Sequence, residues 1–173
     1  MLKTLLATAA IAVSASAVAA ETYSVTVTNT METELLAPIL ITNAANDAHI
    51  FDGHYVTKEA EDQILTGDPK MLAERIGADA MVGHGMDGPP GVLLAPGKSV
   101  TFDIMTDATS VRVISMVAPT EVPDNYVSAV FDLTGVMMAA GQLPRFDIGH
   151  DEGTMKTTKL EGFGGEITFD LKM

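Results

Sequence analysis

The stretch Thr22-Tyr23-Ser24-Val25-Thr26-Val27-Thr28-Asn29 alternates β-forming residues with a period of two. The stretch Lys98-Ser99-Val100-Thr101-Phe102-Asp103-Ile104-Met105 repeats that pattern. Because successive side chains of a strand point to opposite faces, both stretches predict strands with one face in a core and one in water. β-forming residues also predict strands over residues 109–117, 126–133 and 166–172. The run from Val111 to Val117 is apolar enough to predict a central strand.

Other segments predict a shorter strand, two helices and a loop. Residues 36–41 are a candidate strand whose Pro38 favours an edge position. Residues 58–65 and 70–76 predict helices, the second opened by Asp68-Pro69 and ended by Gly77. The glycine- and proline-rich residues 83–91 predict an exposed loop, which leads to a turn at residues 95–98.

These elements predict an all-β fold, namely an antiparallel β-sandwich with a short helical insertion. Strands and helices do not alternate along the chain, so a mixed α/β sheet is disfavoured. Without a long linker or an internal repeat, residues 21–173 are expected to form one domain.

Residues 1–20 have the pattern of a cleaved signal peptide. They combine a basic start at Lys3, a short apolar run and a small-residue end at Ala19-Ala20. We therefore expect the mature chain to be secreted or periplasmic. No other stretch approaches the roughly 18 apolar residues that a membrane-spanning helix needs, so no span is expected in the mature chain. The chain has no cysteine, which excludes thiol catalysis and thiolate metal sites.

The chain is strongly acidic. Its formal net charge is −13, and removal of Lys3 with the signal leaves 9 basic against 23 acidic residues, or −14. Nucleic acid is not expected as a partner, because no basic patch is present to displace the counterions of phosphates. An acidic surface suits divalent cations, but it also serves solubility alone.

Three carboxylates lie in two segments that each follow an apolar run. Asp124 belongs to the turn Pro123-Asp124-Asn125-Tyr126, and Asp147 and Asp151 flank Gly149 in a later loop. Glycine allows a sharp turn, so the last two carboxylates are able to converge. Oxygen ligands of this kind are typical of Ca²⁺ sites. The alternative is that Asp124 caps a turn while Asp147 and Asp151 face water.

The order of these segments resembles the spondin amino-terminal domain, a secreted β-sandwich module, over roughly residues 22–171. The most specific parts are Ser115-Met116-Val117-Ala118-Pro119-Thr120, then Pro123-Asp124-Asn125-Tyr126-Val127, then Phe146-Asp147-Ile148-Gly149-His150-Asp151. The family shows a Ser-Met-Val-X-Pro strand end, a Pro-Asp-aromatic turn and an aromatic-Asp-Ala-Gly-Thr-Asp or Glu loop.

The resemblance implies that Asp124, Asp147 and Asp151 are ligands of one calcium ion. It also implies a non-enzymatic role in adhesion or in recognition of an extracellular or envelope protein or glycan. Ile148 and His150 depart from the family pattern, which has Ala and Thr at those positions. Asn125 also intrudes before the aromatic residue of the turn.

Other readings of the same residues remain open. Glu121 and Glu152 are candidate secondary ligands or solvated neighbours. A secreted hydrolase would use Asp147 and Asp151 as acid and base. A third reading is a metal-free structural envelope protein. The four histidines have no zinc-binding spacing, and the chain contains no nucleophile elbow or phosphate-binding glycine motif.

Overall fold

The alternating stretch near the start of the chain forms strand β1 (Glu21–Asn29). Tyr23, Val25 and Val27 are buried, while the hydroxyl-bearing residues between them face outward. The same alternation places Ile104 of β7 (Ser99–Thr106) in the core. The predicted period of two is therefore confirmed in both strands. The computed structural model describes residues 19–118 and 124–173.

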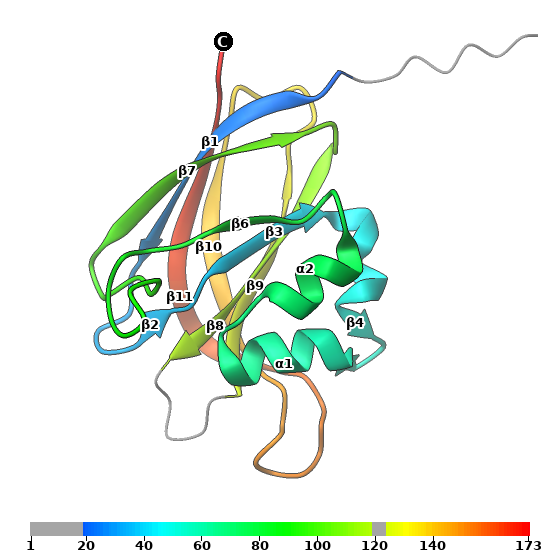
Figure 1. Ribbon diagram of the computed structural model, residues 1–173, viewed down its shortest axis with the longest axis vertical. Helices are drawn as coiled ribbons and strands as arrows, with labels where there is room; N and C mark the ends of the chain where they lie inside the picture. Colours follow the sequence, from blue (N-terminus) through cyan, green and yellow to red (C-terminus); the bar gives the residue numbers. More distant parts are fainter. Residues whose placement is uncertain (1–18, 119–123) are drawn as a thin grey trace, which may run out of the picture.

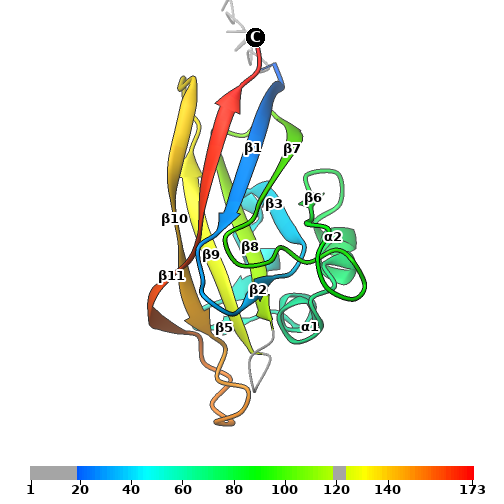
Figure 2. The ribbon, with the colours of Figure 1, turned by 90° about the vertical axis from the view of Figure 1, so that its left-hand side faces the viewer.

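Two antiparallel layers enclose the main hydrophobic core (Figures 1 and 2). The first layer has the strand order β10 (Met138–Asp147), β11 (Thr158–Leu171), β1, β7. The second has the order β6 (Met81–Gly83), β3 (Ile39–Asn43), β8 (Ser110–Ala118), β9 (Asn125–Asp132), with β2 (Leu35–Leu36) also paired to β8. The predicted all-β antiparallel class is confirmed.

The two layers are joined at one end of the molecule. Residues Asn125–Val127 of β9 pair with Arg145–Asp147 of β10, which makes one continuous nine-stranded sheet. This sheet curls until it is nearly closed, with β6 and β7 as its ends. The pairs that join the layers lie next to Asp124 and Asp147, so the join also positions the candidate site.

The helical insertion forms a third layer over the outer face of β3, β8 and β9 (Figure 2). It contains the 3₁₀ helix η1 (Ala44–His49), the hairpin β4 (Phe51–Asp52) and β5 (Tyr55–Val56), and the helices α1 (Lys58–Thr66) and α2 (Lys70–Ile76). A second core lies between this layer and the sheet. Its fully buried members include Leu40, Ile64, Ile114 and Ile148.

Local signals in the sequence account for the helix boundaries. The Thr57 side chain accepts a hydrogen bond from the Ala60 N–H at the start of α1, and Gly67 ends that helix in the left-handed conformation. The Asp68 carboxylate accepts a hydrogen bond from the Lys70 N–H at 3.0 Å, and Gly77 ends α2. Both predicted helices are confirmed. No helix among the described residues is long and apolar enough to cross a membrane.

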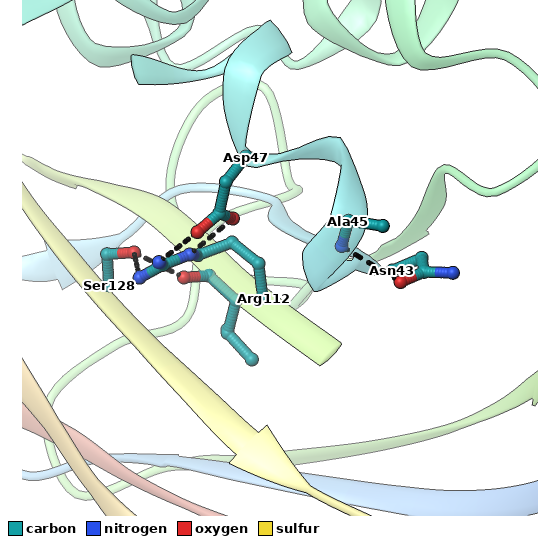
Figure 3. A network of polar contacts seen from close by, with 6 residues as sticks. Asn43, Ala45, Asp47, Arg112 and Ser128 are labelled. Atoms are coloured by element: carbon teal, nitrogen blue, oxygen red, sulfur yellow. Dashed lines mark hydrogen bonds and ion pairs between the residues drawn. The ribbon is translucent and has the colours of Figure 1, made fainter. Parts of the chain in front are cut away.

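Arg112 fixes η1 to the sheet (Figure 3). Its Nε and Nη2 donate to the two carboxylate oxygens of Asp47 at 2.9 and 2.5 Å, and its Nη1 donates to Ser128 Oγ at 3.3 Å. The guanidinium also lies 5.2 Å from the centre of the Phe51 ring. Because the planar guanidinium is held by both a carboxylate and an aromatic ring, η1 has little freedom to shift relative to the sheet.

Some local predictions are wrong. Strand β3 pairs with both β6 and β8, so it is not an edge strand, and Pro38 lies in the connection between β2 and β3. Strand β11 begins at Thr158, well before the predicted residue 166. Residues 162–165, whose glycines are typical of a turn, lie within β11 where its register with β10 shifts. Strand β10 itself was not predicted.

The segment 83–91 is only partly the exposed loop that was expected. Gly83 belongs to β6, and both Gly83 and Gly85 are buried. A Cβ at Gly83 would lie 2.1 Å from the Phe102 ring, and one at Gly85 would lie 2.1 Å from the Leu93 carbonyl oxygen. The glycines are there because the backbone passes close to its neighbours.

Candidate metal centre

The join between β9 and β10 brings the two acidic segments together. Asp124 comes directly before β9, and Asp147 is the last residue of β10, paired with Asn125. The Ile148 N–H donates to the Asp124 carbonyl oxygen at 3.2 Å, which extends this contact by one residue. Asp124 is only 2% exposed, which is unusual for an aspartate.

The loop after β10 turns sharply at Gly149. This residue has φ +68°, and a Cβ there would lie 2.2 Å from Thr154 Oγ1. The Gly149 N–H donates to the Asp147 carboxylate, and the Gly149 carbonyl oxygen accepts from the N–H groups of Thr154 and Met155 at 3.0 and 2.9 Å. The loop projects beyond the end of the sheet (orange in Figure 1). The predicted role of Gly149 as the turning point is confirmed.

Four carboxylates converge at this end of the molecule. One oxygen from each of Asp124, Asp147, Asp151 and Glu152 lies within 4.8 Å of the others. The structure thus brings together the three aspartates that the sequence singled out and Glu152, one of the two candidate secondary ligands. Glu121, also weighed as a secondary ligand, lies outside the described residues with Pro123 and the rest of 119–123.

The surroundings oppose full ionisation of this group. Burial, followed by repulsion from Asp147, raises the pKa of the Asp124 carboxyl. The Asp151 N–H donates to Asp124 Oδ2 at 3.4 Å, a long contact. A hydrogen bond between Glu152 and Asp151 lowers the pKa of Asp151 and raises that of Glu152.

This arrangement fits a hard cation. All four converging groups are carboxylates, which suit Ca²⁺ and Mg²⁺ better than softer metals. Two unit charges about 4 Å apart repel by roughly 4 kcal/mol at an effective dielectric constant of 20. A divalent ion would replace that repulsion by attraction. His150, inside the loop, is exposed and is not part of the group.

The second core supports both acidic segments. Tyr126 and Phe146 stack with ring centres 5.3 Å apart, and Ile148 is fully buried in the same core. The buried residues of the helical layer pack against Ile148 in this core. The Thr157 N–H donates to the His54 carbonyl oxygen at 2.8 Å, which ties the loop to the β4–β5 turn.

From the sequence, Glu152 is a candidate secondary ligand or a solvated neighbour of Asp151. Its inclusion depends on the turn formed by residues 149–153, which places consecutive acids on the same side of the loop. A search of protein-family models and of curated proteins finds no match to this chain.

Proposed function

We propose that this protein is an exported, non-enzymatic β-sandwich module that binds one Ca²⁺ ion at Asp124, Asp147, Asp151 and Glu152. The observation that carries the proposal is the convergence of these carboxylates within 4.8 Å, with Asp124 buried beneath them. A buried carboxylate beside other acids is costly without a compensating charge. The resemblance to spondin domains supports three of these ligands, Asp124, Asp147 and Asp151.

The side chains and the irregular backbone of the acidic loop favour calcium over magnesium. Residues 148–157 offer carboxylates of different reach and an irregular backbone, so they suit the six to eight flexible ligands of Ca²⁺. Magnesium requires near-ideal octahedral geometry and retains more of its water. Backbone carbonyl groups and water would complete the shell around calcium.

The ion would order the projecting acidic loop, and we expect this loop to contact the binding partner. The proposed partner is an extracellular or envelope protein or glycan, as the family resemblance implies. Loops held by a rigid scaffold commonly carry binding functions. Here the scaffold is the β9–β10 join together with the second core beneath it.

The test of the metal site is thermal unfolding of the mature chain, first with excess chelator and then with added calcium. A ligand at 100 times its dissociation constant stabilises the fold by about 2.7 kcal/mol, or roughly 5 to 10 °C for a chain of this size. We expect this rise in wild type, its loss in Asp147→Asn and a weaker rise in Glu152→Gln. Magnesium should produce a smaller effect.

The matched control is Asp170→Asn, which removes one exposed carboxylate from β11 outside the cluster. It should retain the full response to calcium. Equal melting of the wild type with chelator and with calcium would refute the metal site. An equal response in Asp147→Asn would refute the assigned ligands.

Export is tested by the intact mass of the protein recovered from its native compartment. Cleavage after Ala20 predicts a mature chain that begins at Glu21, the first residue of β1. Recovery of the full-length chain in the cytoplasm would contradict the proposed export. Residues 1–18 of the predicted signal lie outside the described residues.

A further inference from the structure

A hollow of about 330 Å³ lies between the junction of α1 with α2 and the segment that precedes β7. It is distinct from the acidic cluster, because none of the four clustered carboxylates lines it. Its size falls at the lower end of the range typical of small-molecule sites. The apolar walls include Pro38, Pro89, Pro90, Leu93 and Met116.

The wall formed by the segment before β7 is held in place by backbone hydrogen bonds. The N–H and carbonyl groups of Asp87 and Leu93 bond to each other at 2.8 and 3.0 Å. The same groups of Leu36 and Leu94 also bond at 2.8 and 3.0 Å. In addition, the Ala95 N–H donates to the Asp87 carboxylate at 3.1 Å. A ligand would therefore meet a wall that is already formed.

Among the described residues, the lining of the hollow offers few free hydrogen-bond donors. Its prolines have no N–H group. Several other N–H groups around it are already used within the protein. They belong to Ala37, which donates to the Met116 carbonyl, Gly67 to the Gln63 carbonyl, Asp68 to Thr66 Oγ1, and Leu93 to the Asp87 carbonyl. An anionic ligand would find few partners.

Acceptors and negative charge are present at the rim. Asp68 is the one ionisable side chain among the described residues that line the hollow, and its carboxylate is exposed. The carboxyl end of α1, at Thr66 and Gly67, also lines it and carries partial negative charge. An ammonium group has three donors and no acceptor, which matches this rim.

We propose that this hollow binds a small primary amine with an apolar body of about ten non-hydrogen atoms. The apolar part would contact Pro38, Leu93 and Met116, and the ammonium group would lie at Asp68 and the end of α1. This site is separate from the proposed calcium site and does not depend on it.

The test is a titration of the mature chain with 2-phenylethylamine, followed by the carbon-13 methyl signal of Met116 in the presence of chelator. The signal is assigned by its loss in Met116→Leu. We expect a saturable shift with a dissociation constant on the order of millimolar, as is usual for a ligand of this size. The neutral analogue 2-phenylethanol should bind about fivefold more weakly, and 3-phenylpropionate more weakly still.

Two variants locate the charge that discriminates between the probes. Asp68→Asn should remove the difference between amine and alcohol while keeping the helix cap, because asparagine also caps helices. The matched control is Asp62→Asn, since Asp62 is an acid on the adjoining helix α1 that does not line the hollow. This variant should still bind the amine more tightly than the alcohol.

Three outcomes would overturn the proposal. The first is the absence of a saturable shift with the amine, which would reject the site. The second is equal affinity for amine and alcohol in wild type, which would reject the ligand class. The third is an unchanged preference for the amine in Asp68→Asn, which would reject the role of Asp68.

Discussion

Gln63 is a polar residue in a position that the fold makes apolar. It lies on the sheet-facing side of α1 between Ala60 and Ile64, and all three side chains are fully buried. Neither its amide nitrogen nor its amide oxygen has a hydrogen-bond partner among the described residues. Burial removes the hydration of this amide, and no hydrogen bond compensates for the loss.

We predict that Gln63→Leu stabilises the protein by about 1 to 2 kcal/mol, because an apolar side chain of similar size removes the unpaired amide. The measurement is urea unfolding at neutral pH. Gln63→Ala is the control, and it should destabilise the fold because it leaves a cavity. A loss of stability in Gln63→Leu would show that the amide has a partner.

Asp124 makes the stability of the metal-free protein depend on pH. Burial, with repulsion from Asp147, raises the pKa of its carboxyl above the ordinary value of 3.8, so the folded state binds the proton more tightly than the unfolded state. Ionised Asp124 therefore destabilises the fold above its raised pKa. That penalty should shrink as the pH falls through the raised pKa and vanish below 3.8.

The measurement is unfolding free energy against pH in chelator, compared between wild type and Asp124→Asn. We expect the difference between the two to favour the variant at neutral pH and to narrow as the solution is acidified. Other acids titrate in the same range, so only this difference reports on Asp124. A constant difference would contradict the raised pKa.

At the scale of elements, the acidic loop depends on two glycines that differ in their surroundings. Gly149 and Gly153 have φ values of +68° and +69°. A Cβ at Gly149 would meet Thr154 Oγ1 at 2.2 Å, whereas a Cβ at Gly153 has nothing within 4 Å. Substitution of Gly149 is therefore opposed by both its backbone conformation and the lack of space. Substitution of Gly153 is opposed by its backbone conformation alone.

We predict that Gly153→Ala costs about 1 to 2 kcal/mol, since only the left-handed backbone opposes the substitution. Gly149→Ala should cost clearly more and should also weaken calcium binding, because the turn between Asp147 and Asp151 would open. Urea unfolding and calcium titration of both variants check this. Equal losses of unfolding free energy in the two variants would contradict this prediction, because they would mean that Thr154 moves aside for the added methyl group.

Strand β10 shows why some elements escape prediction. Its Ala139-Ala140-Gly141 and Pro144 have low β-propensity, so the segment has no strand signal of its own. In the fold, Gly141 leaves space for the Phe131 ring, whose Cε1 would lie 2.8 Å from a Cβ there. Pro144 is accommodated where the register with β11 shifts. The partners on either side determine this strand.

At the scale of the whole molecule, charge is the dominant feature. The mature chain carries 9 basic and 23 acidic residues, a formal charge of −14. Described ion pairs such as Arg75–Glu59 and Lys172–Asp103 neutralise only a few of these acids, at distances of 3.0 and 2.6 Å. Self-repulsion of this kind destabilises a compact state and is screened by salt.

We predict that raising sodium chloride from about 20 to about 500 mM, in chelator, increases the melting temperature by about 2 to 4 °C, equivalent to roughly 1 kcal/mol. The increase should persist in Asp147→Asn, because screening acts on the whole surface. Calcium stabilisation should not persist in that variant. A salt effect lost with Asp147 would place the repulsion in the acidic loop alone.

Local patterns in the sequence are enough to predict the strands with clear alternation, the two helices with their caps and terminal glycines, and the turn at Gly149. These are local properties, because side-chain periodicity and backbone preference act within a few residues. The same local reasoning singled out Asp124, Asp147 and Asp151. Their role as ligands stays a prediction.

The way in which these parts meet depends on long-range contacts that local patterns do not reveal. The join of β9 to β10, the central position of β3, the second core beneath the helices and the approach of Asp124 to the acidic loop all depend on contacts between distant segments. The hollow at Asp68 is likewise formed by segments far apart in the chain. Pairing across the sheet and close packing determine these features, and neither leaves a local pattern in the sequence.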